Sequence, residues 1–168
     1  YAKGIITTET IKAIQEVARP DTIIALDPKP RPSISYTGLS VMTPNRSEAI
    51  KLAGITEEDY KEFPAEIVCK RIYEKYAPKN LIVTLGADGM LLSEKGEVIS
   101  KVPTYAREVF DVSGAGDTVI ASLCVALATG ASMLDAIHFA NTAAGFVVGK
   151  IGTATATPDD IIAYASHK

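Results

Sequence analysis

Residues 111–118, DVSGAGDT, combine glycines with carboxylates where a loop leads into an apolar stretch predicted as helix. Gly114 and Gly116 let the backbone turn tightly and approach a ligand, and unpaired N–H groups at a helix start attract an anion. Asp117 would stand in the first turn, where the helix dipole favours its ionised form. This arrangement suits phosphoryl transfer to an alcohol, with Asp117 accepting the hydroxyl proton. A flexible loop with Asp117 as a helix cap is the alternative that the residues leave open.

Asn45 and Glu48 are three residues apart at the start of another predicted helix, so both face the same side of it. An amide and a carboxylate at this spacing can hold hydrated Mg²⁺ beside phosphates. The same pair is also typical of an ordinary helix cap with an acidic residue in the first turn. The residues by themselves allow either interpretation.

Other polar positions follow predicted strands. Thr84, Gly86 and Gly89 lie in TLGADG, where a hydroxyl and free N–H groups could contact nucleotide phosphates, although any turn between strands looks similar. Lys29 stands among prolines after Asp27, where it is either a phosphate-binding charge or a solvated side chain.

Asn141 lies on an apolar helical stretch and needs a partner there, either backbone or a bound base. The histidines have no companions at metal-ligand spacing. We therefore expect His138 to pack on its helix and His167 to lie in the tail.

The elements that must position these residues form an α/β pattern. Capping residues and apolar periodicity predict the helices, and short apolar runs predict strands buried on both faces. The pattern predicts layers around a mostly parallel sheet. Asp27, Asn45 and 84–86 follow predicted strands, so we expect them along one rim. The expected helices are 7–19, 45–52, 57–76 (with a start or break at Pro64), 118–129, 134–148 and one from 158; the strands are 22–26, 39–43, 80–84 and the hairpin 90–102.

Composition narrows the class of protein. A chain of 168 residues predicts one domain over 1–168. The net charge of −3 argues against nucleic acid as a partner, and no apolar run approaches the roughly 18 residues of a membrane span. Cys69 and Cys124 lie far apart without a CxxC pattern, which disfavours zinc and fits a reducing, cytoplasmic compartment.

Taken in order, these segments resemble the ribokinase/PfkB family of carbohydrate kinases. DVSGAGDT is similar to that family's carboxyl-terminal signature, and NRSE at 45–48 matches its N-x-x-E motif. The heptose-7-phosphate kinase branch, the kinase part of ADP-heptose synthases, is similar over nearly the whole chain. The segments that carry this similarity are YAKG (1–4), DPK (27–29), TPNRSE (43–48), DTVIA (117–121), FANTAAG (139–145) and VVGKIGT (147–153).

The resemblance implies a ribokinase-like fold and an ATP-dependent kinase for a sugar phosphate, D-glycero-D-manno-heptose 7-phosphate in ADP-heptose biosynthesis. It implies Asp117 as the base and the N–H groups of Gly114, Ala115 and Gly116 as the anion hole for the γ-phosphate. The remaining implied contacts are Asn45, Arg46, Ser47 and Glu48 for Mg²⁺ and the ATP phosphates, Lys29, Thr84, Gly86 and Gly89 for the phosphates, Asn141 for adenine, and Asp111 and Ser113 for a monovalent cation, K⁺ in relatives that use it.

The sequence corresponds to the second half of such a kinase, so we expect the amino-terminal half, with its sugar contacts and lid, to be missing here. A lid excludes water and completes a site, so we expect nucleotide binding but little sugar-kinase activity from this chain alone. An uncovered sheet edge or helix face would favour a homo-oligomer. The alternatives are a noncatalytic nucleotide-binding or interaction module and a family kinase for another small alcohol. Retention of Asp117 and both glycines favours the kinase.

Overall fold

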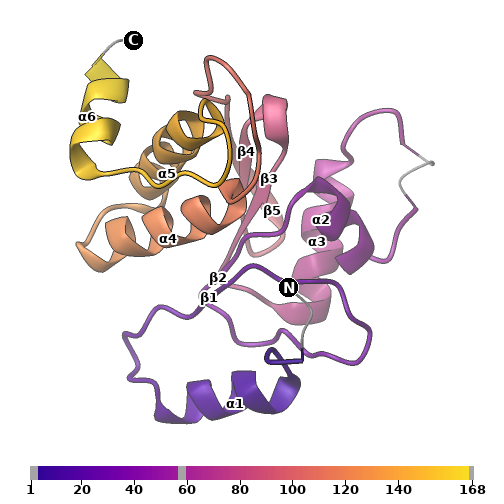
Figure 1. Ribbon diagram of the computed structural model, residues 1–168. Coiled ribbons are helices and arrows are strands. Elements are labelled where there is room, and N and C mark those ends of the chain that lie inside the picture. The colour runs from indigo at the N-terminus through magenta and orange to yellow at the C-terminus, as the bar shows by residue number, and fades with distance from the viewer. Residues whose placement is uncertain (1–3, 57–59, 167–168) are drawn as a thin grey trace. The chain divides into compact units, whose positions relative to one another are not determined.

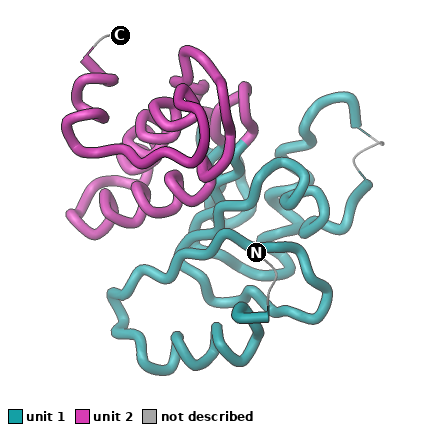
Figure 2. The backbone as a smooth tube through the Cα atoms, viewed as in Figure 1, with its two compact units in different colours: residues 1–84, 91–100 teal, residues 85–90, 101–168 magenta. Residues whose placement is uncertain are grey.

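The computed structural model describes residues 4–56 and 60–166. The chain divides into two compact units, shown in Figure 2. Residues 1–84 and 91–100 form the first unit, and residues 85–90 and 101–168 form the second. The expectation of one domain over 1–168 stays a prediction.

Local caps begin the first two helices of the first unit. Helix α1 (Thr8–Val17) starts after Thr7, whose hydroxyl accepts the N–H of Thr10. Helix α2 (Arg46–Leu52) starts after Asn45 and is followed by Gly54 in the left-handed region. Both helices confirm the prediction, because each was marked by a capping residue within its own segment.

Helix α3 (Ala65–Tyr76) begins directly after Pro64. The proline therefore marks the start of the helix rather than a break within it, and residues 57–59 of the predicted helix lie outside the described residues. Helix α2 packs against α3 and against strand β3 (Asn80–Thr84). Large side chains that are less than 2% exposed fill the core of this unit, among them Met42, Val68, Ile72, Ile82 and Leu91.

A five-stranded sheet in the order β1-β2-β3-β4-β5 runs through the described residues (Figure 1). Strands β1 (Ala25–Leu26) and β2 (Val41–Met42) pair in parallel, and β2 pairs in parallel with β3. Strands β4 (Met90–Glu94) and β5 (Glu97–Val102) are joined by the two residues 95–96, a connection that only antiparallel strands allow. Both turn residues have positive φ, 50° and 85°, as a tight hairpin requires.

Strand β1 corrects one expectation. The run 22–26 was predicted as a strand buried on both faces, but only Ala25–Leu26 pair, and both are half-buried. Strand β1 lies at the edge of the sheet, and among the described elements only β2 packs closely against it, so its faces remain partly open. Val41 and Met42 of the next strand are almost completely buried, at 1% and 0% exposed.

The second unit is built from helices α4 (Ala115–Ala128), α5 (Met133–Val148) and α6 (Pro158–Ser166). Helix α5 packs against both α4 and α6 (Figure 1). Helix α5 is buried along most of its length and α6 begins at its proline, as the sequence predicts. None of the helices in the described part of the chain is both long enough and apolar enough to cross a membrane.

Helix α4 differs from its prediction in two respects. It begins at Ala115 rather than at residue 118, so Asp117 is its third residue. It was also expected to be buried, yet of its described residues only Val119 and Leu123 are buried, and Val125 is 61% exposed. An apolar composition does not reveal how many faces of a helix find neighbours, and α5 covers only one side of α4.

Candidate active site

Polar residues of the first unit gather at the carboxyl ends of its parallel strands. Asp27 follows β1, Asn45 follows β2, and Thr84 ends β3. Asn45 and Thr84 form a parallel bridge, and the N–H of Thr84 donates to the carbonyl of Pro44 at 3.0 Å. The predicted rim is therefore confirmed for these residues.

Asn45 and Glu48 form a reciprocal capping box. The N–H of Glu48 donates to Asn45 Oδ1 at 3.0 Å, and the N–H of Asn45 donates to Glu48 Oε2 at 2.9 Å. The cap interpretation therefore describes the local structure, and it also fixes the direction of the Glu48 carboxylate. A role in nucleotide binding requires the Glu48 carboxylate to have lone pairs that are not already used as hydrogen-bond acceptors.

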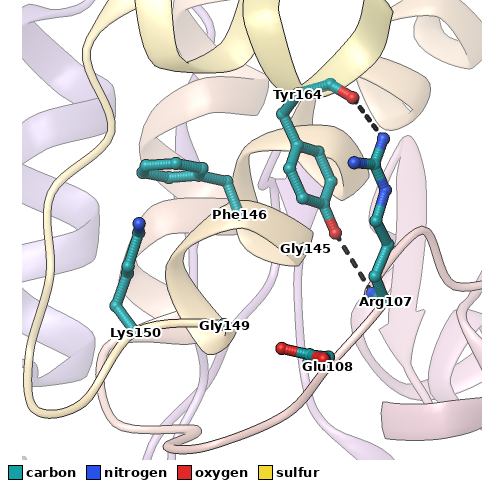
Figure 3. A pocket seen from close by; sticks show the side chains of 7 residues that line it. All are labelled: Arg107, Glu108, Gly145, Phe146, Gly149, Lys150 and Tyr164. Atoms are coloured by element: carbon teal, nitrogen blue, oxygen red, sulfur yellow. Dashed lines mark hydrogen bonds between the residues drawn. The ribbon is translucent and has the colours of Figure 1, made fainter. Parts of the chain in front are cut away.

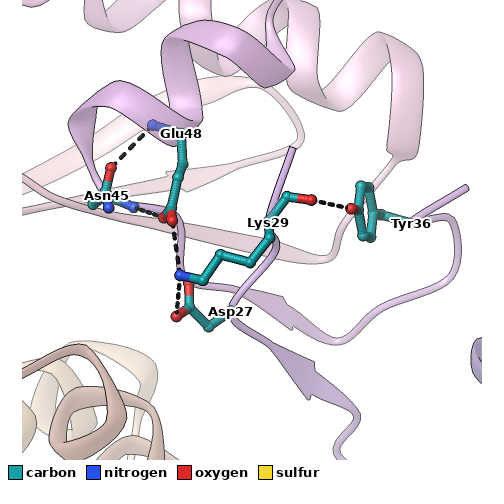
Figure 4. Close-up of polar contacts among 5 residues, drawn as sticks. All are labelled: Asp27, Lys29, Tyr36, Asn45 and Glu48. Carbon is teal, nitrogen blue, oxygen red and sulfur yellow. Dashed lines mark hydrogen bonds and ion pairs between the residues drawn. The ribbon is translucent and has the colours of Figure 1, made fainter. Parts of the chain in front are cut away.

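Lys29 lies between two carboxylates (Figure 4). Its Nζ donates to Asp27 Oδ2 at 3.0 Å and to Glu48 Oε1 at 2.7 Å. Burial lowers the pKa of Lys29, but the hydrogen bonds to Glu48 and Asp27 outweigh it and raise that pKa above its ordinary value. The side chain is 38% exposed and paired, so the interpretation of Lys29 as merely solvated is wrong.

The resemblance seen in the sequence implies Mg²⁺, and the side chains present can be tested as ligands for it. A carboxylate offers about four lone-pair directions, and Glu48 uses one on each oxygen for Lys29 and for Asn45. Among the described residues, no cluster of three or more His, Cys, Asp or Glu side chains could hold a metal. The arrangement therefore fits a hydrated ion held beside phosphates, with water between Glu48 and the metal, better than a direct protein-bound ion.

Two further residues of the N-x-x-E motif lie in the first turn of α2. The Arg46 guanidinium carbon lies 5.7 Å from the centroid of the Phe63 ring. Ser47, the next residue in the chain, is half-buried. Their contacts with a nucleotide stay predictions.

The glycine turn of the second unit presents free donors at the start of α4. Gly114 is the residue before the helix and has φ +80°. The N–H of Ala115 donates to the carbonyl of Val112 at 3.2 Å, so it is partly used. Within the described chain, the N–H groups of Gly116 and Asp117 have no acceptor. The Asp117 side chain is exposed.

Asp111 ties this turn to the segment after α5. Its Oδ1 accepts the N–H of Ser113 at 2.8 Å, and its Oδ2 accepts the N–H of Gly152 at 3.2 Å. The hydrogen bonds from the side chain and backbone of Ser113, with that from Gly152, lower the pKa of Asp111. A Cβ at Gly114 would lie 3.2 Å from Thr153 Cγ2, so the two segments approach closely. The monovalent-cation role of Asp111 and Ser113 stays a prediction.

The two glycines of TLGADG have different surroundings. Gly86 begins a short 3₁₀ helix, Gly86–Asp88, and has φ +62°. A Cβ added at Gly86 would have no neighbouring atom within 4 Å. Gly89 is buried, and a Cβ there would lie 2.0 Å from the carbonyl oxygen of Val102. Packing alone accounts for Gly89, whereas the open space at Gly86 leaves room for a ligand.

The side chain of Asn141 forms a hydrogen bond to the backbone. It is 3% exposed, and its Nδ2 donates to the carbonyl of Pro103 at 2.7 Å. On the same helix, His138 Nδ1 lies 2.7 Å from the Tyr105 hydroxyl with the two rings stacked. The packing role expected for His138 is confirmed, and its partner was not predicted.

A pocket of about 360 Å³ opens in the second unit (Figure 3). The Tyr164 hydroxyl accepts the N–H of Arg107 at 3.1 Å and donates to the carbonyl of Tyr105 at 2.8 Å. The Arg107 guanidinium donates to the Tyr164 carbonyl at 2.6 Å. Gly145, Gly149 and Lys150 fall in the FANTAAG and VVGKIGT segments of the sequence, but the pocket itself was not predicted, because its walls also come from distant segments. They are Arg107, Glu108, Gly145, Phe146, Gly149, Lys150 and Tyr164.

The chain belongs to the pfkB family of carbohydrate kinases, whose model matches residues 6–160. Its fold is that of the ribokinases. It is similar to ribokinase from Thermotoga maritima, with a TM-score of 0.80 and 27% identity over 97% of this chain and 55% of that one. Ribokinase from Arabidopsis thaliana, solved with ribose and ATP, gives a TM-score of 0.76 and 26% identity over 94% and 51%.

Among curated proteins, the chain is similar to bifunctional proteins named HldE. That of Geobacter sulfurreducens is 41% identical over 166 residues, and that of Pelobacter propionicus is 40% identical over 163 residues. Each match covers 96% of this chain and 33% of the relative. The chain thus spans about a third of the length of these relatives.

Proposed function

We propose that this chain is the ATP-binding, catalytic portion of a sugar kinase that phosphorylates D-glycero-D-manno-heptose 7-phosphate in the cytoplasm. The identity of about 40% to HldE proteins supports the choice of sugar. The observation that carries the proposal is the start of α4. There an exposed carboxylate, Asp117, stands beside N–H groups that have no acceptor in the described chain.

In the proposed reaction the second unit supplies the chemistry. The N–H groups of Gly114 and Gly116 would hold the transferred phosphoryl group, with Ala115 joining if its bond to Val112 opens. Asp117 would accept the proton of the sugar hydroxyl as that oxygen attacks the γ-phosphorus, while the bond from this phosphorus to the β–γ bridging oxygen breaks and ADP leaves. The exposure of Asp117 suits this role because the alcohol must reach it.

The residues around Asn45 would act on the phosphates. Mg²⁺, when bound, neutralises charge on the β- and γ-phosphates. Glu48 and Asn45 would hold the hydrated ion through water, and Thr84, Arg46 and Ser47 would line the phosphates.

We assign the adenine of ATP to the pocket beside α5. Asn141 precedes Gly145 by one helical turn, so both lie on the same face of the helix, and Gly145 lines the pocket. Phe146 and Tyr164 meet edge to face, with 6.0 Å between centroids, and offer apolar surface to a planar ring. Asn141 would support the adenine indirectly, through the backbone at Pro103.

Calorimetric titration of the chain with a non-hydrolysable ATP analogue and Mg²⁺ tests the proposal. We expect saturable binding at one site. We also expect Asp117→Asn to bind within about twofold of the unchanged chain, because the substitution removes a proton acceptor and keeps the shape. Absence of binding would contradict the proposal.

A noncatalytic nucleotide-binding module is the second candidate, because the reciprocal capping box by itself accounts for the positions of Asn45 and Glu48. It predicts the same titration result but no effect of Asp117→Asn on phosphoryl transfer in any longer kinase that contains this chain. Turnover therefore separates the two candidates.

A further inference from the structure

Lys29 is held in place from its backbone outward. Pro28 and Pro30 on either side restrict the chain, and the Tyr36 hydroxyl donates to the Lys29 carbonyl. Pro28 and Tyr36 are both buried. The Lys29 ammonium therefore extends to the rim from a conformationally restricted segment, residues 28–30, and not from a flexible loop.

The ammonium also offsets the repulsion between two carboxylates, those of Asp27 and Glu48. Asp27 and Glu48 each place an oxygen within 3.0 Å of Lys29 Nζ, so without the cation they would face each other as like charges. Glu48 is only 13% exposed, so water would compensate it poorly. With Lys29 present, both oxygens of Glu48 are fixed, one by the ammonium and one by the N–H of Asn45.

We propose that Lys29 is a positioning residue of the nucleotide site, which orients Glu48 toward the water shell of Mg²⁺ and does not itself bind phosphate. This inference rests on the proposed function. If Lys29 left the rim for a phosphate, the Glu48 carboxylate would lose its ion pair and would face a polyanionic nucleotide without it. The electrostatics therefore favour Lys29 remaining between the carboxylates while the metal approaches Glu48 through water.

A double-mutant cycle separates positioning from direct phosphate binding. Lys29→Met, Glu48→Gln and the double variant are titrated with the Mg²⁺ complex of a non-hydrolysable ATP analogue. Loss of a partner that orients a metal-site residue typically weakens metal binding by roughly 10- to 100-fold. If Lys29 acts through Glu48, the double variant loses no more affinity than the weaker-binding single variant, whereas independent contacts make the losses multiply.

The same titrations in EDTA give a second readout. A positioning residue leaves binding of the metal-free analogue unchanged within about twofold, while a phosphate-binding lysine loses affinity there too. Lys70→Met, at an exposed lysine of α3, is the matched control for loss of one positive charge. If Lys29→Met does not fold, Lys29→Arg takes its place in the cycle, and it should keep most of the affinity because a cation remains between the carboxylates.

The outcomes are distinguishable. An unchanged chain that fails to bind the Mg²⁺ complex contradicts the proposed function before any variant is made. A chain that binds, but shows multiplied losses in the cycle or an equal loss without metal, overturns the role of Lys29 and leaves the proposed function standing.

Discussion

Substitution of Gly89 by alanine should damage the fold far more than the same change at Gly86. A Cβ at Gly89 would lie 2.0 Å from the Val102 carbonyl oxygen and 2.7 Å from backbone atoms of Pro103 and Thr104. These are backbone atoms, so the clash cannot be relieved by a side-chain rotation. Gly89 also has φ +85°, whereas Gly86 has φ +62° and open space around it.

The magnitudes follow from these two terms. At Gly89 the backbone has φ +85° and ψ −133°, a sparsely populated conformation that costs an L-residue about 1–3 kcal/mol, and forcing an extra group into a packed site costs typically about 1–3 kcal/mol. Gly89→Ala should therefore lower the free energy of unfolding by about 2–6 kcal/mol, and Gly86→Ala, which pays only for a positive φ, by about 1–2 kcal/mol.

Urea unfolding followed by circular dichroism measures both costs, with comparison of the slopes to confirm that the same surface is exposed. Equal losses for the two variants would refute the reasoning from backbone contacts. If Gly86 also lines phosphates, Gly86→Ala should weaken binding of the ATP analogue in a chain that remains folded.

Other predictions concern single polar groups. Thr43 is 5% exposed and its hydroxyl has no partner in the described chain, so Thr43→Val should leave the urea midpoint unchanged or raise stability by about 1 kcal/mol; a clear loss would reveal a partner. Asn45→Ala removes a helix cap and should cost about 1 kcal/mol in the same assay, and no loss would contradict the role of the capping box. The lowered pKa of Asp111 implies stability that is present above its ordinary pKa of 3.8 and lost as the pH falls through the lowered value. Urea midpoints between about pH 5 and 2.5 should therefore converge for Asp111→Asn and the unchanged chain as the pH falls, and a constant gap would contradict this.

Local signals in the sequence were enough for several elements. Thr7 and Asn45 each cap a helix within three residues of themselves, so the starts of α1 and α2 could be predicted. The hairpin of β4 and β5 was equally local, because its turn uses adjacent residues. The edge position of β1 and the exposure of α4 depend on which neighbours arrive from elsewhere in the chain, and no segment carries that information by itself.

The same division holds for the candidate site. The motif residues Asn45 and Glu48 were found by their spacing, and their capping box follows from it. The pairing of Lys29 with Glu48 joins residues 19 apart, and the link from Asp111 to Gly152 joins residues 41 apart, so neither was visible in the sequence. Asp27 was noted as a rim residue and as part of the DPK segment, and its spacing of two residues from Lys29 offered a hint of the ion pair.

The proton-accepting role of Asp117 is the central claim, and turnover in a complete kinase tests it most directly. In a chimera, this chain replaces the third of the Geobacter sulfurreducens HldE protein that it matches, and the rate of phosphoryl transfer from ATP to D-glycero-D-manno-heptose 7-phosphate is measured. Asp117→Asn should lower kcat by roughly 10²- to 10⁴-fold, the usual contribution of a general base, with little change in KM for ATP. An active chimera in which Asp117→Asn keeps kcat within about twofold would contradict the account.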